Sequence, residues 1–322
     1  MARFLSPIYP ACGVPSSGRR MVRHRFIRPM RPSVPLIVIA GFLSALSAAA
    51  PGVVSGQEAA AVPGGLAPEA DADDLVRAVD LALRGERLIE VEALFERLGR
   101  MPLDDRQRGD IVLLRAEFMV ATGRPGEARR LLETLGAAAR EQCRVVAALA
   151  AADIQTDAFA SAERDLRAAQ GRCADDPVYW RALGQAGLGL QLSSAAVDAY
   201  RRALILDPGN HGLQNDLAVA LIADGNTAEA VGLLAGILRE APDRQDVAIN
   251  LDYAGAILGQ VPYRRPADDD AFWSRRLQYA GSGARHAGRA KLAEALYAQA
   301  LMESPRHDET LWQQYAEAAQ QR

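Results

Sequence analysis

The chain is poor in aromatic residues and in lysine. Aromatic residues make up 6% of its 322 positions although apolar residues make up 49%, so alanine, leucine and valine must fill most of the interior. Alanine and leucine are strong helix formers and poor strand formers, which favours closely packed helices over a sheet sandwich. Lys291 is the only lysine, and we attribute this to coding bias and not to arginine selected for recognition.

Acidic residues are absent before Glu58, in a stretch that carries seven arginines. Without residues 1–56 the chain keeps 30 basic and 40 acidic residues, a net charge of −10. So acidic a body is poorly suited to the phosphate backbone of DNA or RNA, which needs clustered positive charge. The composition therefore predicts that the chain has no nucleic-acid partner.

The N-terminal stretch has the order of a secretory signal. A basic start is followed by an apolar run from Val34 to Ala50 and then by small residues. The small residues Val54-Ser55-Gly56 favour cleavage between Gly56 and Gln57. We therefore expect residues 1–56 to be a leader, residues 57–71 a flexible linker, and the mature chain to be exported to the periplasm or envelope.

Two other interpretations of the apolar run remain open. It could stay uncleaved as a membrane anchor, although its 17 residues are short of the about 20 that a span needs. It could also be a buried helix, which the flanking arginines argue against. The stretch before the run is unusually long, so translation could begin at Met1, Met21 or Met30. No cysteine lies near the end of the run, which argues against a lipoprotein.

An internal repeat of 34 residues fills the rest of the chain. Its clearest copy places Gly184, Ala196, Tyr200, Ala203 and Pro208 at offsets 0, 12, 16, 19 and 24. The same offsets hold in three further places: Ala218, Ala230, Leu234, Ile237 and Pro242; Gly281, Ala293, Tyr297, Ala300 and Pro305; and Ala116, Ala128, Leu132 and Leu135. A glycine recurs at offset 7, as Gly123, Gly225, Gly288 and, in a partial copy, Gly259.

These offsets predict a helical hairpin. The offset-7 glycine can adopt the left-handed conformation that ends a first helix. Ala196, Tyr200 and Ala203 then share one face of a second helix, because they are four and three residues apart. Gly184 and Ala196 let the two backbones approach, and bulky side chains fill the space around them: Trp180, Leu183 and Tyr200. Pro208 ends the unit, and the exposed apolar face requires that units stack.

The segments WRALG and AVDAYRRALILDP resemble the tetratricopeptide repeat. The resemblance implies an all-α fold, a right-handed superhelical solenoid of stacked helix-turn-helix repeats. Copies lie near residues 72–104, 109–141, 143–176, 177–210, 211–244 and 274–307. A partial copy at 245–259 is interrupted by VPYRRPADDD, where we expect a short second helix, a kink or a joint. We divide the mature chain into repeats at 72–260 and, at 261–322, the joint, the last repeat and a capping helix.

The sequence contains no recognisable catalytic or metal-binding motif. None of its four histidines has a cysteine or histidine at metal-ligand spacing, and phosphate loops and hydrolase motifs are missing. The run from Asp268 to Asp270 lacks the alternating oxygen ligands of a calcium loop, so we expect it to cap the next helix. We therefore predict no catalytic residue, no metal and no cofactor.

Cys143 and Cys173 flank one predicted hairpin. They lie 14 to 16 residues on either side of its turn, so they should meet at the same end of two antiparallel helices. In an oxidising compartment they could form a disulfide, and the alternative is two small buried thiols. Cys12 lies in the leader.

The resemblance also implies where a partner would bind. In this family the first helices line a concave surface, and positions 2, 5, 9 and 12 of each repeat meet ligands. Carried onto this chain, these positions include Arg181, Gln185, Leu188, Asn215, Val219, Ile222, Tyr253, Arg275, Gln278, Ser282 and Arg285. The alternative is that they are ordinary helix residues.

We expect this groove to have an apolar middle and a basic end. Val219, Ile222 and Tyr253 would give the middle, and Arg275, Gln278 and Arg285 would suit a carboxylate or an acidic peptide. The family's clamp for chaperone tails is not carried over, because Asp216 stands where that set needs asparagine.

These features predict a non-catalytic scaffold that binds proteins or peptides in the bacterial envelope. The segments NDLAVALIADGNTAEAVGLL and NLDYAGAILGQ are similar to the tetratricopeptide protein of Flp/Tad pilus assembly. The resemblance implies a part in assembling a pilus, secretion or polysaccharide-export complex. The alternative is a regulatory subunit of an envelope enzyme complex, and an uncleaved leader would add a membrane contact.

Overall fold

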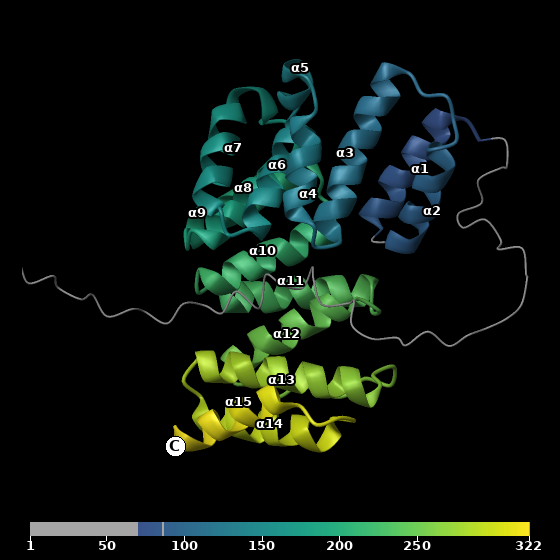
Figure 1. Ribbon diagram of the computed structural model, residues 1–322. Coiled ribbons are helices and arrows are strands. Elements are labelled where there is room, and N and C mark those ends of the chain that lie inside the picture. The colour runs from purple at the N-terminus through teal and green to yellow at the C-terminus, as the bar shows by residue number, and fades with distance from the viewer. Residues whose placement is uncertain (1–69, 86, 322) are drawn as a thin grey trace, which may run out of the picture. The chain divides into compact units, whose positions relative to one another are not determined.

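The computed structural model describes residues 70–85 and 87–321, which form α-helices joined by turns and contain no strand (Figure 1). All of the described residues lie in one compact unit. The predicted leader, its apolar run and the cleavage site lie outside the described residues. Among the described helices, none is both long and apolar enough to cross a bilayer.

Twelve of the described helices form six antiparallel hairpins. Their first helices are α1 (Ala72–Arg84), α3 (Asp105–Ala121), α6 (Cys143–Gln155), α8 (Pro177–Gly189), α10 (His211–Ala223) and α13 (Asp270–His286). Their second helices are α2 (Leu88–Leu98), α4 (Pro125–Glu133), α7 (Phe159–Cys173), α9 (Ser193–Leu206), α11 (Thr227–Glu240) and α14 (Ala290–Glu303). The remaining helices are α5 (Ala137–Arg140), α12 (Gln245–Ile257) and α15 (Glu309–Gln320).

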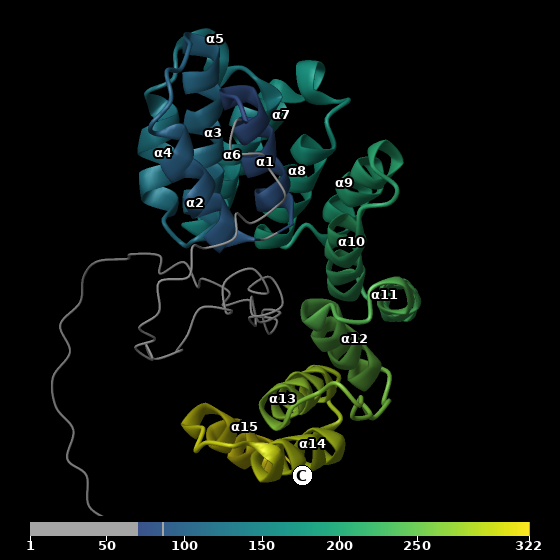
Figure 2. The same cartoon turned by 90° about the vertical axis from the view of Figure 1, so that its right-hand side faces the viewer.

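The hairpins stack in chain order, as Figure 2 shows. Each first helix packs against its own second helix, and from α1 to α12 the first helices contact one another in turn. Second helices pack on the first helix that follows, as α7 does on α8 and α9 on α10. The predicted all-α solenoid of stacked hairpins is confirmed.

The turns after α3, α10, α12 and α13 have the predicted backbone conformation. Gly123, Gly225, Gly259 and Gly288 all have positive φ, between 69° and 88°. Two hairpins have another residue at the same offset, and Asp157 (φ 59°) and Gln191 (φ 61°) adopt the left-handed conformation there. The geometry of the repeat therefore requires this conformation whether or not glycine supplies it.

Close packing of glycine against tyrosine recurs in two hairpins. A Cβ on Gly184 would lie 2.8 Å from the Tyr200 ring, and one on Gly281 would lie 2.7 Å from the Tyr297 ring. Both tyrosines are fully buried, and burial raises their pKa. The remaining small residues of the pattern are completely buried: Ala196, Ala203, Ala218, Ala230, Ala293 and Ala300. Trp180 is buried and donates its indole N–H to the carbonyl of Ala174 (2.7 Å).

Two first helices are longer than the repeat predicts. The copies expected at residues 109 and 274 begin with α3 at Asp105 and α13 at Asp270, each one turn earlier. Each has an aspartate cap, because Asp104 accepts from the backbone N–H of Gln107 and Asp269 from that of Phe272, both at 2.7 Å. The Asp104 cap was not predicted from the sequence, whereas a cap from the run Asp268 to Asp270 was. Pro208, Pro242 and Pro305 follow the ends of α9, α11 and α14 as predicted.

The partial copy has no second helix. After α12 the chain runs without helix through residues 258–269 to α13, and we call this segment the strap. Arg265 of the strap donates to the carbonyl of Pro242 before α12 (3.1 Å), whereas Arg289 after α13 donates to the carbonyl of Ile257 (3.0 Å). The two helices are therefore parallel, and the strap returns the chain along them. We expected a short second helix, a kink or a joint after α12, and the structure has a joint without a helix.

Candidate functional site

Polar side chains link several of the first helices to the next. Arg181 of α8 pairs with Asp216 of α10 (2.7 Å), and Asn250 of α12 donates to Asn215 of α10 (2.9 Å). Gln278 and Arg285 of α13 reach Gln314 (2.9 Å) and Glu317 (2.7 Å) of α15. The partners in this series are 32 to 36 residues apart, about one repeat. We call the surface that carries it the first-helix face.

The series also runs through the first three repeats. Gln107 and Arg106 of α3 both bond to Asp73 of α1, at 2.8 and 2.7 Å, and lower the pKa of that carboxyl. Gln155 of α6 donates to the carbonyl of Val120 in α3 (2.9 Å). Polar contacts therefore cross the first-helix face from α1 to α6 as well.

Arg144 joins three helices at this end of the chain. Its guanidinium binds Glu117 of α3 through two bonds, at 2.7 and 2.6 Å, and also pairs with Asp80 of α1. Burial alone would lower the pKa of Arg144, but the two carboxylates raise it above its ordinary value. Arg144 is therefore permanently charged and held in place by α1 and α3.

A pocket of about 440 Å³ lies beside Arg144, between α1, α3 and α6. Its lining includes Val76, Asp80, Leu81, Asp110, Leu113 and Arg144. The prediction of partner-binding residues began only at Arg181 and missed this pocket. The same rule would have found it, because Val76, Asp80, Asp110, Leu113 and Arg144 occupy positions 2, 5 or 9 of the first three repeats.

The polar residues of the predicted groove are largely bonded to neighbouring residues. Asp216, which replaces the asparagine of the family's clamp, bonds to Arg181, and Asn215 bonds to Asn250. Ser282 contacts the hydroxyl of Tyr297 (3.1 Å), and Arg285 is paired with Glu317. Arg275 is exposed, Gln185 is half-buried, and Leu188 packs against the core. The predicted basic end is thus partly neutralised by α15.

The predicted apolar middle is buried. Val219, Ile222 and Tyr253 are 9%, 7% and 1% exposed, and the last two belong to a core cluster shared by α9 to α12. Burial raises the pKa of Tyr253 to about 12, and its hydroxyl has no hydrogen-bond partner. These side chains do not form an open apolar strip, contrary to our expectation. Their part in binding stays a prediction.

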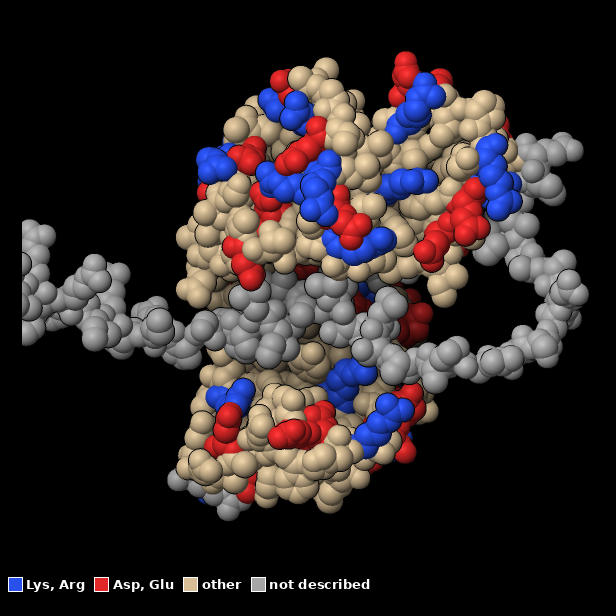
Figure 3. Space-filling view, viewed as in Figure 1, with Lys and Arg blue, Asp and Glu red and all other residues tan. Residues whose placement is uncertain are grey.

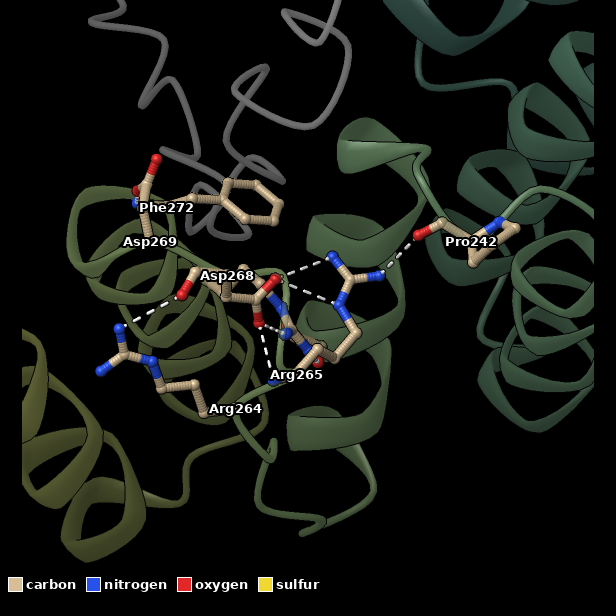
Figure 4. Close-up of polar contacts among 8 residues, drawn as sticks. Pro242, Arg264, Arg265, Asp268, Asp269 and Phe272 are labelled. Carbon is tan, nitrogen blue, oxygen red and sulfur yellow. Dashed lines mark hydrogen bonds and ion pairs between the residues drawn. The ribbon is translucent and has the colours of Figure 1, made fainter.

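A buried ion network fixes the strap. Arg276 of α13 binds Asp252 of α12 through two bonds, at 2.6 and 3.1 Å, and also pairs with Asp268 of the strap. All three side chains are nearly inaccessible, at 4%, 6% and 1% exposed. Asp268 also accepts from the backbone N–H of Arg265 (2.9 Å), as Figure 4 shows. At this joint, buried ion pairs hold the strap against α12, whereas in the other repeats a second helix covers the first.

The three consecutive aspartates have three different environments. Asp269 caps α13, as predicted, and Asp270 pairs with Arg264 (2.5 Å). Asp268 turns to the other side and joins the buried network (Figure 4). In the described residues, no group of histidine, cysteine and acidic side chains could hold a metal ion.

A disulfide joins Cys143, at the start of α6, to Cys173, at the end of α7. Their Cα atoms are 5.4 Å apart, as the predicted meeting at one end of the hairpin requires. The bond closes a separation of 30 residues. Because Cys143 directly precedes Arg144, the disulfide also anchors the end of α6 that lines the pocket.

The surface seen in Figure 3 mixes charges of both signs. Basic and acidic side chains lie side by side over the described part and do not separate into large patches of one sign. Many arginines of the described residues are paired with a carboxylate of their own helix or of a neighbouring one, such as Arg167 with Glu163 and Arg201 with Glu229. An excess of one charge on this surface is therefore confined to small clusters of residues.

Comparisons with known proteins agree with this architecture. Residues 194–251, from α9 to α12, match the family model described as the tetratricopeptide repeat. The chain is similar to a chain of the APC/C hetero-tetramer Cut9–Hcn1, with a TM-score of 0.54 and 15% identity over 77% of this chain and 49% of that one. It thus spans about half the length of that protein. No curated protein matches it in sequence.

Two further solved structures are similar. The apo form of RapI has a TM-score of 0.54 and 10% identity, over 76% of this chain and 79% of that one. TTC0263, a tetratricopeptide protein of Thermus thermophilus, has a TM-score of 0.43 and 17% identity, over 66% and 99%. The fold defines a solenoid of stacked helical hairpins. Residues 194–251 match the tetratricopeptide repeat, and the other hairpins of the described residues share its helix-turn-helix fold.

Proposed function

We propose that the chain is a non-catalytic scaffold of the bacterial cell envelope. In this role it docks partner proteins while a pilus, secretion or polysaccharide-export complex assembles. The observation that carries the proposal is the first-helix face, which continues through successive repeats and holds a pocket at its N-terminal end. Proteins with this fold are in general interaction scaffolds, and one similar chain belongs to the APC/C hetero-tetramer Cut9–Hcn1.

The envelope location rests on the N-terminal sequence and on the cysteines. Basic residues, an apolar run and small residues follow one another in the order of an export signal. A disulfide between Cys143 and Cys173 suits an oxidising compartment outside the cytoplasm. Each feature supports export independently of the other.

Intact mass of the chain isolated from its native host tests the location. We expect a mass that corresponds to Gln57–Arg322 and that rises by about two daltons on reduction, since two thiols replace one disulfide. A mass that retains the leader, with both thiols free, would overturn the envelope location. Crosslinked purification from the same host then tests the scaffold role. Recovery of one reproducible envelope complex supports the role, and recovery of the chain alone contradicts it.

A further inference from the structure

We propose that the pocket between α1, α3 and α6 binds a basic, apolar segment of a partner protein, in which an arginine or lysine adjoins a leucine-sized residue. This inference rests on the scaffold role and adds the place and the chemistry of one contact. The pocket opens on the first-helix face and holds about 440 Å³.

The apolar part of the pocket is formed by α1 and α3. Leu81 is 62% exposed at its edge, Val76 is half-buried, and Leu113 is nearly buried. Covering an exposed leucine with another apolar side chain removes both from water and stabilises the complex. A leucine-sized side chain of the partner therefore fits here.

The pocket lining carries two carboxylates, Asp80 and Asp110, and two arginines, Arg77 and Arg144. When the ion pairs that extend from these residues are counted as well, the cluster has five carboxylates and four arginines, since it gains Asp73, Asp74, Glu117, Arg84 and Arg106. Asp80 and Glu117 share the guanidinium of Arg144, and Asp80 is also paired with Arg84 at 2.8 Å. Within the described part of the chain, Asp110 has one ion pair, with Arg106 at 3.3 Å, and Arg106 is bound more closely by Asp73, at 2.7 Å. The Asp110 side chain is also 43% exposed. It is thus the least neutralised carboxylate of the pocket, and a cation of the partner could bond to it from solvent.

An acidic segment fits the pocket less well. Its carboxylate would approach Asp80 and Asp110, and the two arginines of the lining are already engaged. Arg144 is held by Asp80 and Glu117, and Arg77 pairs with Asp74 (2.5 Å). Outside the leader the chain carries a net charge of −10, which attracts basic segments over a longer range. Local and overall charge therefore select the same sign of partner.

A short fluorescein-labelled peptide in which leucine and arginine alternate is the probe. Its binding to the mature, oxidised chain is followed by fluorescence anisotropy. We expect Asp110→Asn to weaken binding about fivefold to tenfold, because a charge-assisted bond is lost. Leu81→Ser should weaken it about threefold to fivefold, because less apolar surface is covered. Both side chains are at least partly exposed, so thermal unfolding of both variants should match the parent.

Two matched variants separate the pocket from general attraction. Asp198→Asn removes one exposed carboxylate from α9, and Ile89→Ser removes an exposed apolar side chain from α2. Both should bind the probe as the parent does. Peptides with glutamate for arginine, or serine for leucine, should bind more weakly than the probe. The proposal is overturned if the control variants weaken binding as much as the pocket variants, if the pocket variants bind normally, or if the acidic peptide binds best.

The outcome is separate from that of the envelope role. If the pocket fails to select the basic peptide while the chain still co-purifies with an envelope complex, only the pocket inference is wrong. If the chain proves cytoplasmic while the pocket variants lose the probe, the pocket inference stands and the envelope location is wrong.

Discussion

The α8/α9 hairpin and the α12–strap–α13 joint solve the same packing problem by different means. In the hairpin, a second helix covers the first, and a tyrosine ring closes over Gly184 without any buried charge. In the joint, an extended segment covers α12, and a buried arginine holds two aspartates from different segments. The comparison teaches that the repeat can lose a helix when ion pairs replace its apolar contacts.

The largest expected effect is at the joint. Arg276→Leu leaves Asp252 buried without its cation and leaves Asp268 with Arg265 alone, and we expect a loss of about 3–5 kcal/mol in the free energy of unfolding. The adjacent Arg275→Leu is the control, because Arg275 is exposed, and it should change stability by less than about 0.5 kcal/mol. Urea unfolding followed by circular dichroism measures both. Equal stability of the two variants would mean that the ion network is not what holds the joint.

The α6/α7 hairpin adds a covalent bond to the packing of a regular repeat. Replacing Cys143 and Cys173 together by serine should cost roughly 3–4 kcal/mol, the loop-closure value for a separation of 30 residues. Reductant should lower the melting temperature of the parent and leave that of the double variant unchanged. A parent that is indifferent to reductant would contradict this account.

In the regular hairpin, the close contact of Gly184 with Tyr200 predicts a smaller effect. Gly184→Ala should destabilise the chain by about 1–3 kcal/mol, because a Cβ there would be 2.8 Å from the Tyr200 ring. Gly232 of α11 is the matched position, with no atom within 4 Å of an added Cβ. Gly232→Ala should instead stabilise by up to about 1 kcal/mol through helix propensity. Melting curves of the two variants test the opposite signs.

The smallest effect concerns the turn of the same hairpin. Gln191 has the positive φ that glycine adopts at this offset in other repeats. Gln191→Gly should stabilise by roughly 0.5–1 kcal/mol, since the relief of strain exceeds the added flexibility of the unfolded chain. Gly225→Ala, at the same offset with φ 88°, should destabilise by a similar or larger amount. If both variants shift stability in the same direction, the turn does not constrain the backbone as we describe.

The regular repeats could be predicted from the sequence because close packing of the helices requires small and large residues at a fixed spacing along the chain. Gly184, Ala196 and Tyr200 must recur at fixed offsets for helices to approach, so their positions can be read directly. Gln191 has the same positive φ although it is not a glycine, so only the structure identifies its conformation.

The ion network of the joint could not be predicted in this way, whereas the lining of the pocket could have been. Arg276 and Asp268 look like ordinary surface residues, and they are buried only because the strap folds back over α12. The pocket depends on three repeats being placed together, although its residues occupy positions that the family rule already names. Applying the rule to α1, α3 and α6 as well as to α8 and later helices would have predicted its lining.

Site-specific photo-crosslinking in the native host tests the central claim, that partners dock on the first-helix face. A photoreactive residue is placed at Leu81 of α1 or at Ile89 of α2, both of them exposed apolar positions, at 62% and 88%. We predict a discrete partner adduct from position 81 and none from position 89. Adducts from position 89 alone, or equal adducts from both, would contradict the assignment of the docking surface.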